Sequence, residues 1–329
     1  MKFHVSSYNT FPTAAGLASS AAGYAALVFA LAQLMRAQEQ YPHQLSTLAR
    51  QGSGSACRSL YGGLVAWRMG HGPDWTDSLA EPVSDEHSWP EMRVLIFVVS
   101  AQKKDTSSTE GMETSVKTST LLAHRASTVV PERLPRLEKA WKEHDFSTFG
   151  QLTMQDSNQF HATCLDTYPP IFYLNDISRA IIRLITVYNQ FYGEVRAAYT
   201  FDAGPNAVLY LLQPYWVDVA AYLLYFFPSP PADAAAADGA MPYIHYRPDD
   251  QAWMDQVQQQ HVVDPALIQA GLATGRIPQA GDVKRVYATR PGPGPQVLSA
   301  QDSNLDPTTG LNIYHPPTTG GSSSNESTE

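Results

Sequence analysis

The chain of 329 residues contains only two cysteines, Cys57 and Cys164. A disulfide framework needs more cysteines than this, so the sequence predicts a protein of a reducing compartment. The chain also lacks any long run of lysine and arginine, and its formal net charge is −9 at pH 7. This balance argues against a nucleic-acid-binding surface. An anionic ligand would have to bind through local cations, for which Arg58, Lys103 and Lys104 are candidates.

Charged residues are also missing between Asn9 and Met35, and Lys2 precedes this stretch. A segment of this kind can be a signal peptide or a membrane-spanning helix. Here proline, glycine and serine interrupt it, and the purely apolar run from Ala25 to Ala32 is short. We therefore favour a helix buried inside a soluble domain.

Hydrophobic residues make up 43% of the chain and charged residues 16%, which is typical of a globular protein. The length allows two domains. Hydrophobic patterning predicts strands at residues 3–8, 63–69 and 92–100, and two strands within 197–212 around a turn at Gly204-Pro205. It predicts helices at residues 18–35, 45–50, 110–145, 145–166 and 170–192. The remaining predicted segments are a loop at 52–55, a connection at 70–90, a surface insertion at 229–240 and a disordered tail at 315–329.

The segment FPTAAGLASSAAG, residues 11–23, combines small residues with the start of a helix. Small residues let a ligand approach the backbone, and a helix N-terminus attracts anions. A tightly packed core helix would have the same composition, and the residues alone leave the two interpretations even. A Walker phosphate loop is absent, because G-x-x-x-x-G-K-[ST] occurs nowhere in the sequence.

Two further segments carry cations among hydroxyl groups. In GSGSACRSLYGG, residues 52–63, Arg58 follows two serines and two glycines. A guanidinium among hydroxyls and backbone amides suits a bound carboxylate or phosphate, so we favour an anion site over a flexible linker. In AQKKDTSSTEGM, residues 101–112, lysines precede a run of serine and threonine. A solvated turn with a helix cap at Ser108 or Thr109 explains this second segment slightly better than a binding site does.

A lone carboxylate occurs in YTFDAGPNAVL, residues 199–209, where Asp202 follows apolar strand residues. Strand interiors disfavour aspartate, so Asp202 either caps the turn or orients a reacting group. His161 lies in DSNQFHATCLD without a second histidine or carboxylate at metal-ligand spacing. We interpret His161 as a core residue or as one that contacts a functional residue without touching the ligand.

These segments, in this order and spacing, resemble the diphosphomevalonate decarboxylase family of eukaryotic type. The resemblance spans about residues 3–300, and the combination of FDAGPN with SGSACR carries most of its specificity. It implies an α+β fold of the superfamily that includes galactokinase, homoserine kinase and mevalonate kinase. It also implies two domains, the second of them ferredoxin-like. The implied reaction is ATP-dependent decarboxylation of (R)-5-diphosphomevalonate to isopentenyl diphosphate, with Mg²⁺ bound to the nucleotide and no metal site on the protein.

The resemblance also implies roles for individual residues. ATP-binding residues would be Ala14, Ala15, Gly16, Leu17, Ala18, Ser19, Ser20 and Lys104. Substrate-binding residues would be Ser53, Gly54, Ser55, Ala56, Cys57, Arg58 and Thr109. Catalytic residues would be Asp202, Arg58 and Ser108.

The resemblance further implies a homodimer in the cytoplasm, acting in isoprenoid and sterol biosynthesis. Residues 1–88 would be the remainder of an N-terminal ATP- and substrate-binding domain, 89–300 the decarboxylase domain, and 301–329 a disordered tail. Family members carry further strands ahead of the position of Phe3, so we expect an incomplete N-terminal domain. Two alternatives stay open. One is a catalytically inactive truncated homologue or gene-model fragment, and the other is a superfamily kinase that stops after phosphorylation.

Overall fold

The computed structural model describes residues 5–11, 17–100, 106–230, 243–259, 262–311 and 313. The helices α1 to α11, with the figure's numbering, are α1 (Ser19–Met35), α2 (Gln44–Gly52), α3 (Ser108–Thr118), α4 (Thr120–His124), α5 (Val130–Lys142), α6 (Phe146–Asp166), α7 (Asp176–Tyr192), α8 (Trp216–Phe226), α10 (Gln251–Gln258) and α11 (Pro265–Leu272). The strands are β1 (Leu64–Trp67), β2 (Ala80–Ser84), β3 (Met92–Val98), β4 (Ala197–Phe201), β5 (Ala207–Leu212), β6 (Ile244–His245) and β7 (Arg285–Thr289). A 3₁₀ helix, η1, spans Gly54–Leu60, and a π-helical turn, η2, spans Arg125–Val129.

Among the described residues that precede β3, a small unit consists of α1, α2, η1 and the antiparallel pair β1–β2. Its core consists of small side chains from both helices and η1, including Ala21, Ala25, Ala49 and Ala56. In α1 only Ala21 and Ala25 are buried, so the helix buries a single face, and Met35 at its end is 67% exposed. The helix that was expected to be buried inside a domain is therefore buried on one face.

Three local predictions for this unit need correction. The described part of the expected first strand, Val5 to Tyr8, has no regular secondary structure. The glycine-serine loop predicted at 52–55 instead ends α2 and begins η1, because Ala56 and Leu60 pack against α1 and α2. The connection predicted at 70–90 contains β2, whose Pro82 is tolerated because this two-stranded sheet consists of edge strands.

The second unit is built on a five-stranded sheet with the order β4-β5-β3-β7-β6. The four strands β3, β4, β5 and β7 pair antiparallel, and helices connect β3 to β4 and β5 to β7. This βαββαβ connectivity is the ferredoxin-like arrangement that was expected. Six of the seven residues of β3 are buried, as the apolar run Met92 to Val98 predicted for a central strand.

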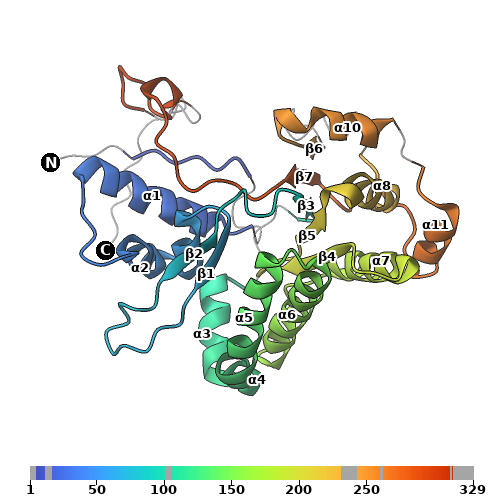
Figure 1. Ribbon diagram of the computed structural model, residues 1–329, viewed down its shortest axis with the longest axis horizontal. Helices are drawn as coiled ribbons and strands as arrows, with labels where there is room; N and C mark the ends of the chain where they lie inside the picture. The colour runs from blue at the N-terminus through green and yellow to red at the C-terminus, as the bar shows by residue number, and fades with distance from the viewer. Residues whose placement is uncertain are drawn as a thin grey trace, which may run out of the picture.

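Helices cover both faces of this sheet (Figure 1). One face packs through Leu95, Phe97 and Leu209 against α7, α8, α10 and α11. The other face packs through Met92 and Ala198 against α5 and α6, with Trp89 between them. The helix α6 spans the predicted range and begins after Asp145, whose carboxylate accepts a hydrogen bond from the Thr148 N–H at 3.0 Å.

The two units are in contact along a seam. Arg68, which follows β1, pairs with Glu138 of α5. The Gly63 N–H donates to the carbonyl of Gly292 at 3.0 Å, so the segment after β7 returns to the first unit. Most of the surface insertion predicted at 229–240 and all of the tail predicted at 315–329 are outside the described residues. None of the described helices combines the length and apolar character that crossing a membrane requires.

Candidate active site

The turn between β4 and β5 carries Asp202, and it bends sharply enough for the Gly204 N–H to donate to the Asp202 carbonyl at 2.7 Å. Its two strands and turn match the predicted range. The Asp202 side chain is exposed. It makes no hydrogen bond or ion pair within the part of the chain that the structure describes. Its carboxylate is therefore available to a ligand.

Three polar side chains fix this turn, two from neighbouring helices and one from the turn itself. Ser157 of α6 accepts a hydrogen bond from the Phe201 N–H at 3.1 Å, and Ser178 of α7 donates to the Pro205 carbonyl at 2.7 Å. Asn206 is 1% exposed, and its Oδ1 accepts from the N–H groups of Val99 and Ser100 at 2.8 and 3.0 Å. A carboxylate on so constrained a turn loses little conformational freedom when it meets a reacting group.

His161 packs against the strand end that leads into this turn. Its ring is 7% exposed and lies edge-on to Phe201 at a centroid distance of 6.2 Å. Burial lowers the pKa of His161 to about 4, although the Phe201 backbone and the Asp202 charge act in the opposite direction. The ring is therefore neutral at physiological pH, and the interpretation of His161 as a core residue is confirmed.

The N-terminus of α3 begins at Ser108, and its cap is Ser107, whose Oγ accepts from the Glu110 N–H at 3.1 Å. The cap predicted at Ser108 or Thr109 is thus shifted by one residue or two, because neighbouring serines and threonines have similar capping ability. Thr109 is exposed and Ser108 half-buried. Lys103 and Lys104 lie outside the described residues.

The predicted substrate-binding residues Ser53 to Arg58, which we call the clamp, lie largely in the 3₁₀ helix η1. Its Ala56 and Cys57 side chains are fully buried, and burial raises the pKa of the Cys57 thiol. These two residues can reach a ligand only through their backbone. Ser53, Gly54 and Ser55 are half-buried, and Arg58 is exposed.

The Arg58 guanidinium lies 5.9 Å from the centroid of the Trp67 ring on β1. It makes no hydrogen bond or ion pair to any described residue, so its donors are free for an anion. Its field reaches Tyr210 of β5. Burial raises the pKa of the Tyr210 phenol, and the Arg58 charge partly opposes that rise. Arg58 is therefore close enough to the sheet of the second unit for its charge to act there.

The described residues among those predicted to bind ATP lie beside this clamp. Ser20 Oγ is 3.2 Å from Ser53 Oγ, which links the start of α1 to the start of η1. Ala18 precedes α1 in a left-handed conformation, with φ of 55°. Leu17 and Ser19 are described too, whereas Ala14, Ala15 and Gly16 are not.

The predicted residues thus form two groups. Ser20, Ser53 and Arg58 belong to the first unit, whereas Asp202 and Ser108 belong to the second. Tyr210, near Arg58, pairs with Ala198, which lies four residues before Asp202 on β4. At a rise of about 3.3 Å per residue, that places Tyr210 and Asp202 roughly 13 Å apart along the sheet. A ligand that contacts both groups must span a distance of this order.

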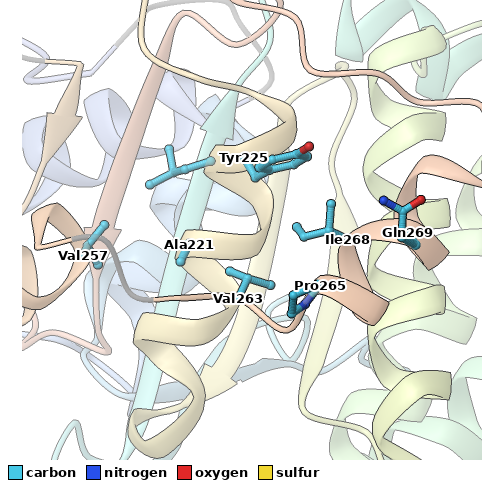
Figure 2. Close-up of a pocket in the computed structure, with 8 residues that line it drawn as sticks. Ala221, Tyr225, Val257, Val263, Pro265, Ile268 and Gln269 are labelled. Atoms are coloured by element: carbon cyan, nitrogen blue, oxygen red, sulfur yellow. The ribbon is translucent and has the colours of Figure 1, made fainter.

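A hydrophobic cavity of about 400 Å³ lies elsewhere, between α8, α10 and α11. Figure 2 shows Ala221 and Tyr225 of α8 on one side of it and Pro265 and Ile268 of α11 on the other. None of the predicted site residues lines it. We therefore do not assign the chemistry to this cavity.

Sequence reasoning missed three residues that shape the site. Asn206 appears in FDAGPN only as a turn residue, Trp67 only as part of a strand, and Tyr173 as one aromatic among several. Tyr173 donates from its hydroxyl to the Ser107 carbonyl at 3.3 Å and packs in one cluster with Ala203. Contacts of this kind leave no local sequence signal.

Two family models match the chain. The model of the mevalonate 5-diphosphate decarboxylase C-terminal domain matches residues 94–298, and that of the diphosphomevalonate decarboxylase-like N-terminal domain matches residues 1–80. The chain belongs to the diphosphomevalonate decarboxylase family. The reaction of this family is ATP-dependent decarboxylation, so its enzymes are lyases.

Curated relatives share high identity. Diphosphomevalonate decarboxylase of Danio rerio is 60% identical over 227 residues, which are 69% of this chain and 56% of the relative. That of Rattus norvegicus is 49% identical over 306 residues, which are 92% of this chain and 70% of the relative. The chain thus spans between about half and about seven tenths of the length of these two relatives.

Solved structures agree with the fold. Mevalonate diphosphate decarboxylase from Trypanosoma brucei is 35% identical with a TM-score of 0.78, over 89% of this chain and 72% of that one. The structure of MDDEF in complex with MVAPP, AMPPCP and magnesium is 32% identical with a TM-score of 0.57, over 65% of this chain and 64% of that one. The α+β fold of the small-molecule kinase superfamily is confirmed.

Proposed function

We propose that this chain catalyses the ATP-dependent decarboxylation of (R)-5-diphosphomevalonate to isopentenyl diphosphate, with release of ADP, phosphate and carbon dioxide. The observation that carries this proposal is the turn at Asp202. An exposed carboxylate without a partner among the described residues stands on a backbone that Ser157, Ser178 and Asn206 hold rigid. Such rigidity favours a group that positions a reacting atom.

Asp202 and Arg58 would act on opposite ends of the reacting unit. Asp202 orients the 3-hydroxyl of the substrate toward the γ-phosphate of ATP and accepts its proton late, since phosphoryl transfer depends mainly on positioning. The phosphorylated tertiary alcohol then loses phosphate, and the carbon–carbon bond to the carboxylate breaks to give the alkene. Arg58 holds that carboxylate with two parallel hydrogen bonds, which aligns the bond that breaks.

ATP would lie along the start of α1, with Ser20 near the transferred phosphate and Ala14 to Ser19 beside the others. The positive end of the α1 dipole favours a phosphate at this place. Magnesium would arrive with the nucleotide and neutralise its phosphates. Lys104 would pair with the ATP phosphates, and Ser108 and Thr109 would contact the phosphate and the substrate. The magnesium and the ATP analogue described for MDDEF support this assignment by similarity.

The remaining substrate contacts would come from Ser53 to Cys57, through hydroxyls and backbone. We assign residues 1–88 to ATP and substrate binding, 89–300 to the decarboxylase domain and 301–329 to a tail. We also propose a cytoplasmic homodimer that serves isoprenoid and sterol biosynthesis. These last assignments rest on the family resemblance alone.

The test is to incubate the purified chain with Mg-ATP and diphosphomevalonate carrying a labelled carboxylate, and to measure carbon dioxide and phosphate together. We expect equal release of both. Asp202→Asn should reduce turnover by about a hundredfold or more with little change in the affinity for either substrate. Release of ADP without carbon dioxide would indicate a kinase instead, and no reaction at all would favour an inactive homologue.

A further inference from the structure

Tyr173 lies between two parts of the candidate site that are distant in sequence. It is 8% exposed and belongs to a small cluster with Cys164, Ile171 and Ala203, the residue that follows Asp202. Its ring is edge-on to His161 at a centroid distance of 6.5 Å. Tyr173 is therefore packed directly against the turn that carries Asp202.

The other end of Tyr173 reaches α3. Its hydroxyl donates a hydrogen bond to the carbonyl of Ser107, the cap residue of that helix, at 3.3 Å. One turn further along, a Cβ atom added to Gly111 would lie 2.4 Å from the Tyr173 hydroxyl oxygen and 3.5 Å from Cζ. Real Cβ atoms do not approach an oxygen so closely. Gly111 thus makes the space in which the phenol fits against the helix.

The phenol also stays protonated under physiological conditions. Burial raises the pKa of Tyr173 to about 12, and the nearby carboxylates of Asp202 and Glu110 act in the same direction. The hydroxyl is then a permanent donor to the Ser107 carbonyl. Its bond does not depend on pH across the neutral range.

We propose that Tyr173 is a positioning residue that fixes the N-terminus of α3, with Ser108 and Thr109, relative to Asp202. This inference rests on the proposed function, in which Ser108 and Thr109 contact phosphate and substrate while Asp202 orients the reacting hydroxyl. Ser107 and Tyr173 are 66 residues apart in sequence. A displacement of the helix start by about 1 Å would misalign the reacting groups and cost turnover heavily.

Three variants of the full chain test this contact: Gly111→Ala, Tyr173→Phe and the double variant. Alanine at 111 collides with the hydroxyl oxygen, so we expect the unfolding equilibrium to shift toward the unfolded state by tenfold or more. Tyr173→Phe removes that oxygen and leaves Cζ at an ordinary contact distance. The double variant should therefore be at least as stable as Tyr173→Phe alone, because alanine favours a helix more than glycine does.

The positioning role is tested by kinetics and binding. We expect Tyr173→Phe and Gly111→Ala to lower kcat by roughly tenfold or more, with the KM for ATP nearly unchanged. Binding of AMPPCP with magnesium, measured by calorimetry, should stay within about twofold. Tyr168→Phe is the matched control, because Tyr168 is 78% exposed, and it should change neither stability nor kcat.

Independent, additive effects on stability in the double variant would disprove the contact. Wild-type kcat in Tyr173→Phe would disprove the positioning role, even if Tyr173→Phe removes the destabilisation caused by Gly111→Ala. Failure of the proposed function has a different signature, because the wild-type chain itself would then release no carbon dioxide. In that case the role in catalysis is disproved together with the proposed function. If Tyr173→Phe still removes the destabilisation caused by Gly111→Ala, Tyr173 is a structural contact only.

Discussion

Arg68 donates to Glu138 through Nη1 at 2.5 Å and to Glu81 through Nε at 2.7 Å. Arg68 follows β1 in the first unit, and Glu138 lies on α5 in the second, with its side chain 14% exposed. The hydrogen bond to Glu138 is the largest cause of the raised pKa of Arg68. This pair therefore joins the unit that carries Arg58 to the unit that carries Asp202.

Glu138→Gln should lower the free energy of unfolding by about 1 to 2 kcal/mol, because a half-buried guanidinium loses its charged partner. Glu143→Gln is the matched control near the end of the same helix. Its partner Lys139 is 3.8 Å away and both side chains are mostly exposed, so the change should be below about 0.5 kcal/mol. Urea unfolding curves of the two variants give the comparison. Equal effects would mean that the seam contact contributes nothing specific.

Gly62→Ala should destabilise the chain by about 1 to 3 kcal/mol. A Cβ atom at this position would lie 2.6 Å from the Gly294 nitrogen and 2.7 Å from the Gly292 oxygen, and backbone atoms cannot move aside cheaply. Gly23→Ala is the control, since a Cβ there meets no other side chain of the described residues within 4 Å. It lies within α1 and should stabilise by up to about 1 kcal/mol. Thermal unfolding measures both, and a tolerated Gly62→Ala would contradict the close packing of 292–294 on the first unit.

The free energy of unfolding should fall as the pH decreases from about 6.5 to about 4, and His161 should cause part of this fall. The unfolded chain binds a proton at a pKa of 6.5, whereas the buried ring resists protonation until about pH 4. Stability from this group is thus complete above pH 6.5 and is lost below it, by about 3 kcal/mol at most. The difference between the wild type and His161→Gln across this range isolates the effect. His87→Gln, whose side chain is 85% exposed, should leave the pH dependence unchanged.

Arg58→Lys should lower kcat/KM for diphosphomevalonate by about tenfold or more, because an ammonium cannot form two parallel hydrogen bonds to a carboxylate. The exposed Arg36 at the end of α1 provides the control, and Arg36→Lys should be neutral. Steady-state kinetics of decarboxylation measures both. A fully active Lys variant would show that Arg58 makes no bidentate contact with the substrate.

The prediction of local structure succeeded where the local signal was strong. The apolar run Met92 to Val98 can satisfy its side chains only in a buried strand, and Asp145 caps α6 at the start that the sequence indicated. It failed where packing contacts with other segments determine the local structure. Residues 52–55 have a loop composition, yet packing of Ala49, Ala56 and Leu60 placed all of them except Ser53 in helices.

The sequence by itself determined the family, the α+β class and the residue types at the site, because short motifs and hydrophobic periodicity are local properties of the chain. It could not determine which of these residues meet. The closeness of Arg58 to Tyr210, the hydrogen bonds from Val99 and Ser100 to Asn206 and the bond from Tyr173 to Ser107 each join segments more than 60 residues apart. Such contacts exist only after the sheet and its helices have packed, so the tertiary structure alone decided them.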